Sequence, residues 1–312
     1  MNRILYIAIF LVILFANNCF AQSSDDAKYE QARMFYNSKE YTKALPILKE
    51  LANKNHAKSY NVLGLCYEHG YGVSADIEKA YDYYLKGAEL GYCYAQRNLA
   101  WLFQTEKYME LHPDIDHYKK AEQWLRLAAK QNPDIMYELA CFYDAMQVMN
   151  EWQDKDANIY YIKAAESGNA KAQARIGFIW LTEQKFNDAL SVLNKAKSGG
   201  VKYISISEVD DNKEAIDVLI MLCTFFKKNG NLAYKGHQTL NNKVYVNAVK
   251  SNAKEGCLLL SLTGKIIAQT PFVYNYIYYN VDEDYFEVKI EDSTGNMQYK
   301  KIDITGKDIT KK

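Results

Sequence analysis

The sequence contains little proline and no block of like charge. Only four of its 312 residues are proline, and no long polar tract interrupts it. Extended disorder is therefore excluded except near the ends. The 38 basic residues balance the 38 acidic ones, and no stripe of lysine or arginine stands out. A nucleic-acid-binding protein needs such a stripe to replace counterions, so we expect no nucleic-acid partner.

Recognisable catalytic motifs are also missing. The sequence has no Gly-x-Ser-x-Gly, phosphate-binding loop, His-Glu-x-x-His or dinucleotide-binding glycine pattern. We therefore assign no catalytic residue, expect no cofactor and predict a non-enzymatic protein. One compact cluster, residues 112–117, holds two histidines and two aspartates. A polar loop explains it better than a metal site, since zinc needs three or four converging ligands.

Cysteine pairs of the Cys-x-x-Cys type are absent as well. Five of the six cysteines lie beyond residue 21, and an odd number leaves at least one thiol unpaired. Cys66 and Cys141 fall within predicted helices, which favours buried thiols. A bridge between Cys66 and Cys93 stays open at this point.

The only long apolar run is at the N-terminus. Arg3 precedes twelve apolar residues, 4–15, and Ala21 precedes a polar stretch. This layout is typical of a secretory signal peptide cleaved after Ala21, and twelve residues are too few to span a membrane comfortably. A lipoprotein signal at Cys19 is the first alternative, but Ala-Asn-Asn precedes the cysteine instead of the expected Leu-Ala-Gly. An ordinary core helix is the second. We expect an exported, periplasmic or extracellular protein without a transmembrane segment in the mature chain.

Beyond the signal, the sequence repeats itself. Four segments read apolar, small, two variable residues, aromatic, with the small residues Gly64, Ala100, Ala140 and Gly177 spaced by 36, 40 and 37 positions. A fainter first copy lies around Ala32. Each copy is followed by an alanine, with an apolar or aromatic residue four positions later and a small or apolar residue seven positions later. This spacing places all three on one helical face. The helices are expected to stop at Gly91, Gly168 and Gly199.

These patterns indicate helix pairs that must stack to bury their apolar faces. Small residues allow the two helices of a pair to approach closely. The residues that we expect to pack the repeats are Leu63, Gly64, Tyr67, Ala80, Tyr84, Leu99, Ala100, Ala121, Leu139, Ala140, Ala157, Ile176, Gly177 and Ala189.

The clearest copy, residues 57–92, resembles the Sel1-like repeat, a relative of the tetratricopeptide repeat. It carries Leu63-Gly64, a Gly-Tyr-Gly-Val sequence at 70–73, and Lys-Gly-Ala-Glu-Leu-Gly at 86–91. The resemblance covers roughly residues 27–200 and implies a right-handed α-solenoid of about five helix pairs, within a domain that spans residues 22–200. Copies three and four lack the Gly-x-Gly-Val loop, and copy three carries an insertion near residues 110–118, where irregular loops are expected.

The resemblance also implies that the first helices line a concave groove that binds a partner. The positions that map onto such a groove are Lys58, Asn61, Glu68, His69, Arg97, Trp101, Gln104, Tyr137 and Asp144. An apolar stripe of Leu65, Trp101, Cys141 and Phe178 lies along the same side. It could receive a partner helix or peptide, but helical stripes of this kind usually pack within the core, and we favour that interpretation.

The pattern changes after residue 200. Residues 210–228 predict one more helix, within a capping or linker segment 201–230, and residues 231–312 predict a small antiparallel β domain. The predicted strands centre on 244–246, 258–262 and 286–290, with turns near Gly264, at 293–296 and at 305–306. Two Thr-Gly-Lys sequences, 42 residues apart, weakly resemble a WG-type β repeat whose tryptophan is missing. We expect a chain ending at Gly230 to stay soluble and helical.

Together these features define a mainly α fold and a non-catalytic scaffold or adaptor of the cell envelope that binds a protein or peptide partner. The alternative is a carbohydrate or cell-wall binder that uses the tyrosines at 274–279, although strands favour tyrosine in any case. A cell-wall hydrolase is the third hypothesis, and it lacks a nucleophile with a partnered base.

Overall fold

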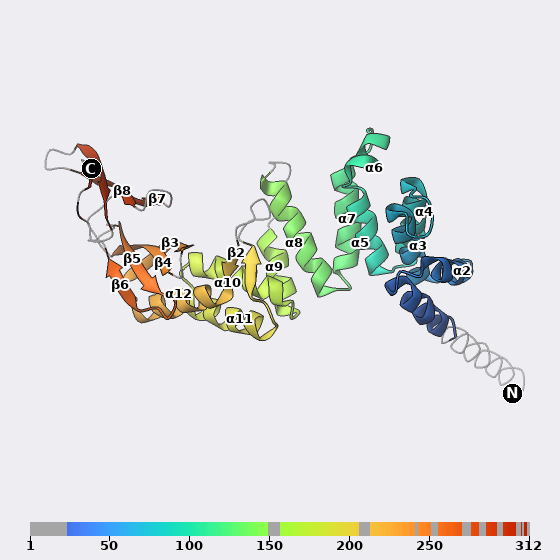
Figure 1. The fold of residues 1–312 in the computed structure, drawn as a ribbon, viewed down its shortest axis with the longest axis horizontal. Helices are drawn as coiled ribbons and strands as arrows, with labels where there is room; N and C mark the ends of the chain where they lie inside the picture. Colours follow the sequence, from blue (N-terminus) through green and yellow to red (C-terminus); the bar gives the residue numbers. More distant parts are fainter. Residues whose placement is uncertain are drawn as a thin grey trace, which may run out of the picture. The chain divides into compact units, whose positions relative to one another are not determined.

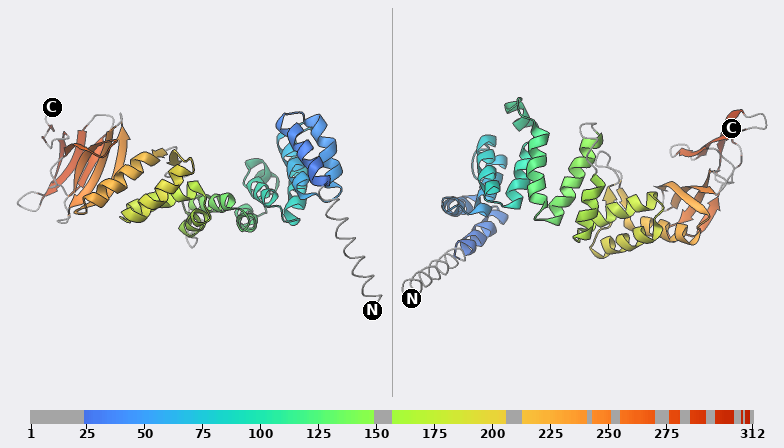
Figure 2. Two further views of the ribbon diagram at one scale, coloured as in Figure 1. Left: turned by 90° about the horizontal axis from the view of Figure 1, so that it is seen from below. Right: turned by 180° about the vertical axis from the view of Figure 1, so that it is seen from behind.

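The computed structural model describes residues 24–148, 157–205, 213–240, 243–250, 255–269, 276–280, 285–291, 296–303, 307 and 309–310. The chain divides into two compact units, Met1–Leu139 and Ala140–Lys312. Figures 1 and 2 show that the first unit is helical and that the second combines helices with β-sheets, whose strands are antiparallel.

The first unit consists of paired helices. A helix over residues 24–37 precedes α2 (Tyr41–Ala52), and α3 (Ala57–His69) packs against α4 (Ile77–Glu89). In the next pair α5 (Cys93–Leu102) packs against α7 (His117–Ala129). The short helix α6 (Glu106–Leu111) leads into residues 112–116, which are irregular as expected for the insertion near residues 110–118. The last helix, α8 (Pro133–Val148), continues into the second unit. Helix α3 also contacts α5, so these two first helices lie side by side.

Local sequence signals set the ends of these helices. Asp76 and Asp116 cap α4 and α7 by accepting hydrogen bonds from the backbone N–H groups three residues later, at 3.0 and 3.1 Å. Gly70 and Gly91 follow α3 and α4 with φ of 73° and 83°, a conformation that glycine adopts without a steric penalty.

The expected packing positions form the interior of the repeats. Thirteen of the fourteen are buried, and Tyr67 alone is half-buried. The small residues stand where the two helices of a pair are closest. A Cβ atom on Gly64 would lie 2.5 Å from the Tyr84 ring, and one on Gly177 would lie 2.5 Å from Cγ of Leu193. The helices can approach this closely because the repeat places glycine at these points.

The second unit begins with the remainder of α8 and continues with α9 (Ala157–Glu166), α10 (Ala170–Thr182) and α11 (Phe186–Ser198). The left-handed glycine after α11 is Gly200, with φ of 85°, and not Gly199, whose φ is −76°. The helix expected over 210–228 is shorter: α12 spans Ile216–Lys228. It begins later because β2 (Lys213–Ala215) pairs with β1 (Tyr203–Ser205) just before it.

The C-terminal strands form two antiparallel sheets. The first has the order β3 (Leu232–Leu240), β4 (Lys243–Lys250), β5 (Glu255–Ser261) and β6 (Ile266–Gln269), and the second has β7 (Tyr276–Asn280), β8 (Tyr285–Glu291) and β9 (Met297–Ile302). The predicted strand centres fall in β4, β5 and β8, and a strand also precedes them from Leu232. The turn at Gly264 has φ of 78°. The turn residues 293–295 and 305–306 lie outside the described residues. The WG-type resemblance stays a prediction.

The first sheet shares its core with the last helix pair. Phe226 of α12 stacks on Phe186 of α11 at 5.6 Å and meets the Tyr234 ring of β3 at 5.5 Å. Leu222, Val246 and neighbouring residues of α10, α11, α12 and β3–β5 join them in one buried cluster. The domain limits predicted at residues 200 and 230 stay predictions, but the packing across both is continuous.

Candidate partner-binding face

Six residues of the first unit form a surface that we call the first-helix face: Asn61 on α3, Tyr94, Arg97, Asn98 and Trp101 on α5, and Glu138 on α8. Three of them belong to the groove predicted in the first unit from the sequence, and the other three were missed. Helical spacing places Tyr94, Arg97, Asn98 and Trp101 on one side of α5, because they stand three, four and seven positions apart.

An ion pair links α5 to α8 on this face. The Nε of Arg97 donates to Oε2 of Glu138 at 2.6 Å, and the indole Nε1 of Trp101 donates to the same oxygen at 3.3 Å. The side chains of Arg97 and Glu138 are 35% and 23% exposed, and Trp101 is 44% exposed. Glu138 therefore fixes both an arginine and a tryptophan at the surface.

An amide pair links α5 to α3. The Nδ2 of Asn98 donates to Oδ1 of Asn61 at 2.8 Å. Asn61 is only 7% exposed, and Asn98 is half-buried. Tyr94 is 41% exposed, and Nδ2 of Asn132 donates to its hydroxyl at 3.1 Å. Polar groups thus lie at the base of the face, and aromatic rings stand out from it.

The other predicted groove residues mostly have partners within the chain. Lys58 donates to Asp26 at 3.1 Å, and Gln104 donates to a backbone carbonyl of its own helix at 3.0 Å. Glu68 accepts a hydrogen bond of 2.5 Å from the Tyr84 hydroxyl. His69 is exposed and lies 3.9 Å from Glu68, and Tyr137 is half-buried.

Asp144 belongs to the second unit. Its Oδ2 accepts hydrogen bonds from Nη2 of Arg175 at 2.7 Å and from the Tyr161 hydroxyl at 3.0 Å. The Arg175 and Asp144 side chains are 15% and 25% exposed, so this pair braces α8, α9 and α10 within the unit.

The apolar stripe divides along its length. Phe178 packs against the core of the second unit, and Leu65 and Cys141 are half-buried, as the packing interpretation expects. Trp101 differs, because nearly half of its surface is exposed. Its indole N–H requires a polar partner, and Glu138 supplies one at the surface.

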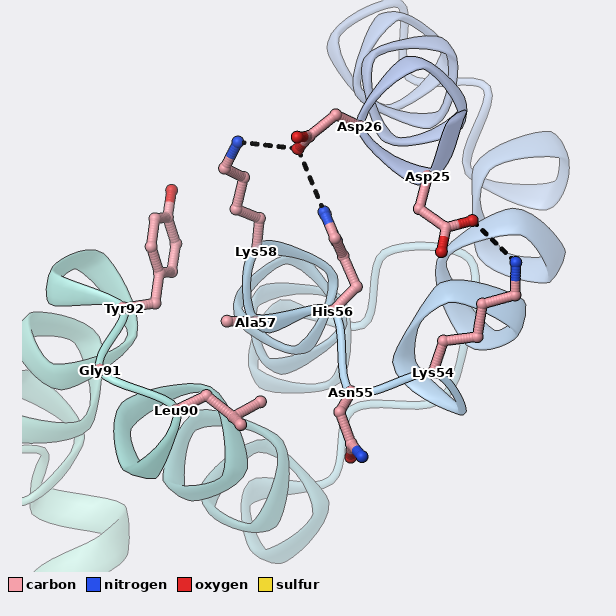
Figure 3. A pocket seen from close by; sticks show the side chains of 10 residues that line it. All are labelled: Asp25, Asp26, Lys54, Asn55, His56, Ala57, Lys58, Leu90, Gly91 and Tyr92. Carbon is pink, nitrogen blue, oxygen red and sulfur yellow. Dashed lines mark hydrogen bonds and ion pairs between the residues drawn. The ribbon is translucent and has the colours of Figure 1, made fainter. Parts of the chain in front are cut away.

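Figure 3 shows an open cavity in the first unit, which the sequence did not predict. It has a volume of about 540 Å³ and lies between residues 54–58, residues 90–92 and the start of the first helix. Asp26 pairs with Lys58 at 3.1 Å and lies 3.4 Å from Nε2 of His56, and Lys54 pairs with Asp25 at 2.7 Å. The pair with Lys58 lowers the pKa of Asp26. The charges that line the cavity are thus matched among themselves.

The cysteines and the 112–117 cluster show no reactive arrangement in the described residues. None of the five described cysteines forms a disulfide, so Cys66 and Cys93 do not pair in this structure. Burial raises the pKa of Cys66 to about 11 and the pKa of Cys257 to about 12, which keeps these thiols protonated. Nε2 of His112 lies 2.8 Å from Glu78, and Nε2 of His117 lies 2.8 Å from the carbonyl oxygen of His112. In the ranges given above, no group of three or more His, Cys, Asp or Glu side chains is placed to hold a metal ion.

Two further expectations depend on regions of which little is described. The tyrosine run begins at residue 274, outside the described residues. For residues 276–280 the structure describes only the backbone, as strand β7. The predicted cell-wall or glycan contact therefore stays a prediction.

Among the helices that the structure describes, none is long and apolar enough to cross a membrane.

The helices form pairs, small residues lie where the two helices of a pair are closest, and the first helices α3 and α5 lie side by side. These features define a helical-repeat protein. The family profile of the Sel1 repeat matches three consecutive segments, residues 57–92, 93–133 and 136–169. These three segments are thus Sel1 repeats, as the sequence indicated, and a repeat fold of this kind implies a protein-interaction scaffold.

Individual relatives share part of the chain. A Sel1-like repeat-containing protein of Acanthamoeba polyphaga mimivirus is 28% identical over 142 residues, which is 46% of this chain and 25% of that protein. The matched region thus spans a quarter of the length of that relative. A Sel1 repeat protein from Oxalobacter formigenes is 25% identical, with a TM-score of 0.46 over 58% of this chain and 76% of that one. A protective antigen of uropathogenic Escherichia coli with an SLR fold is 22% identical, with a TM-score of 0.49 over 67% of this chain and 43% of that one.

Proposed function

We propose that this protein is an exported, non-catalytic scaffold of the cell envelope and that it binds a protein or peptide partner through the first-helix face. The observation that carries the proposal is the cluster of Arg97, Trp101 and Glu138, with Tyr94 exposed one helical turn from Arg97. Tryptophan, tyrosine and arginine dominate the binding energy of protein interfaces, particularly where other contacts hold them rigid.

The rigidity of the cluster supports this assignment. A long arginine side chain usually loses rotamer freedom when a partner binds, at a cost of about 0.5–1.5 kcal/mol. Here Glu138 already holds Arg97 through Nε, and it holds the indole of Trp101 through the same oxygen. Both side chains are therefore ordered before a partner arrives. Among the described residues Arg97 makes no second hydrogen bond, so its terminal nitrogens remain for the partner.

Site-specific photo-crosslinking tests the proposed face. A photoreactive phenylalanine analogue replaces Trp101 in one variant and Leu127 in another, and both are expressed in the parent cells. Leu127 is the matched control, because it is an apolar residue with similar exposure, 43%, on the second helix α7. We expect a discrete crosslinked protein from position 101 and none from position 127. Equal crosslinking at both positions, or none at either, would contradict the proposal.

Export rests on the N-terminal sequence. Its layout of a positive start, an apolar run and a small residue at position 21 supports a signal peptide. N-terminal sequencing of the protein from the envelope or extracellular fraction should yield Gln22 as the first residue. Recovery of the uncleaved chain from the cytoplasmic fraction alone would refute export and would leave the binding proposal intact.

A further inference from the structure

The amide pair at the base of the first-helix face has unused hydrogen-bonding capacity. A side-chain amide offers two N–H donors and one carbonyl acceptor. The bond from Asn98 to Asn61 leaves the Nδ2 group of Asn61 and the Oδ1 atom of Asn98 without a partner in the part of the chain that the structure describes. Neither atom is among the side-chain polar atoms that are sealed from solvent. One donor and one acceptor, on two side chains that this hydrogen bond joins, thus remain unsatisfied within the described chain and open to solvent.

This combination does not depend on which asparagine donates. If both amides were turned over, Asn61 would donate to Asn98, and one acceptor and one donor would still remain. A partner that satisfies both must carry an acceptor and a donor side by side. Backbone peptide groups have this property, because every residue except proline has one N–H and one C=O.

The backbone of an extended segment is available for such bonds, whereas that of a helix is not. Within a helix the N–H and C=O groups bond to each other, and only those at the ends are free. In an extended segment they project sideways at alternate residues. The amide pair lies between α3 and α5 and is mostly buried, at 7% exposure for Asn61, so a segment must lie close against the face to reach it.

We propose that the face binds its partner as an extended segment, whose backbone N–H and C=O groups pair with Asn98 and Asn61. This inference rests on the proposed function, and it specifies how the partner is held. A carboxylate on the segment would meet the terminal nitrogens of Arg97, the residue next to Asn98, because Arg97 donates to Glu138 through Nε alone. A large apolar side chain would pack on the exposed ring of Trp101, one turn further along α5. The occupant is thus an extended peptide with an acidic residue and a large apolar residue close together.

The probe is a display library of random twelve-residue linear peptides, selected on the immobilised mature chain. Enriched peptides are synthesised, and their affinity is measured for the wild type and for Asn61→Asp. This substitution keeps an oxygen for the Asn98 donor and removes the donor that would meet the peptide carbonyl. The matched control is Asn37→Asp, at an exposed position near the end of the first helix. We expect Asn61→Asp to weaken binding about tenfold, as the loss of one well-placed hydrogen bond would, and Asn37→Asp to have no effect.

The conformation of the bound peptide supplies a readout that does not require Asn61→Asp to fold. Cα chemical shifts of the labelled peptide, bound to the wild-type chain, should be those of an extended backbone. Helical shifts, or unchanged affinity for Asn61→Asp in a folded variant, would overturn the inference while binding that depends on Trp101 still supports the proposed function. If no enriched peptide loses affinity for Trp101→Ala, the proposed function fails together with the inference.

Discussion

Gly64 of α3 faces the ring of Tyr84 of α4 so closely that a Cβ atom would lie 2.5 Å from Cδ1 and Cε1 of the tyrosine. Tyr84 is fully buried, and its hydroxyl donates to Glu68 one turn beyond Gly64 on the same helix. The ring therefore cannot move aside without losing both its packing and its hydrogen bond. Gly177 and Leu193 repeat the close approach in the second unit.

The first prediction concerns this contact. Gly64→Leu should lower the free energy of unfolding by about 3 kcal/mol or more, because overpacking at a buried helix crossing outweighs the gain in helix propensity. Chemical denaturation followed by circular dichroism measures the change. Gly230→Leu is the control, since nothing lies within 4 Å of a Cβ at that position. Similar unfolding curves for Gly64→Leu and the wild type would contradict the described packing.

The second prediction concerns alkaline pH. Burial raises the pKa of Tyr84 and Tyr161 far above the ordinary value of 10.0. The unfolded chain ionises these hydroxyls first, so the stability that they contribute is complete below pH 10 and is lost as the pH rises above it. Buried thiols such as Cys66, with a pKa of about 11 against 9.0, add to the loss from pH 9 upward.

Denaturation at several pH values should thus show stability falling steeply above about pH 10. The double variant Tyr84→Phe and Tyr161→Phe should show a shallower fall. Tyr299→Phe, at a position that is 71% exposed, should keep the slope of the wild type. An equally steep fall in the double variant would mean that these tyrosines do not control alkaline unfolding.

The third prediction reverses an expectation from the sequence. A chain ending at Gly230 lacks the sheet that covers Phe226 and Leu222, which are fully buried in the shared core. We expect α10 to α12 to lose protection from hydrogen exchange in this shortened chain, because large apolar side chains become exposed. The full-length chain is the reference. Unchanged protection of α12 would show that the sheet is dispensable.

The fourth prediction separates binding from stability at Glu138. Glu138→Gln should change the free energy of unfolding by less than about 1 kcal/mol, since partly exposed ion pairs contribute little. It should nevertheless weaken crosslinking at position 101, because Arg97 and Trp101 lose the charge that orients them. Glu122→Gln on α7, whose pair with Arg126 spans 3.5 Å, is the control and should change neither property. Undiminished crosslinking in Glu138→Gln would contradict the role of the cluster.

The repeats could be predicted from the sequence because their packing is local and periodic. The glycine or alanine of each first helix and the alanine of each second helix recur at similar intervals, and Gly64, Tyr84 and Gly177 occupy the interior as expected. The profile match at 57–92 coincides with the copy that the sequence marked as clearest. The strands could be placed approximately from alternation, as in β4 and β8.

The remainder depended on contacts between distant residues. Glu138 and Asn98 follow no pattern within their own helices, and their roles appear only when neighbouring repeats bring Arg97 and Asn61 within reach. The start of α12 was misplaced because the pairing of Ala215 with Tyr203 decides it, and helix propensity does not report strand pairing. The shared core of α12 and the sheet was missed for the same reason.

The most direct test of the central claim is hydrogen exchange on the chain from residue 22 onward, with and without the protein captured by crosslinking at position 101. If the first-helix face is the binding surface, added partner should protect α3, α5 and the start of α8 and leave α4 and α7 unchanged. Protection confined to the second helices, or to the strands between residues 232 and 302, would contradict the account.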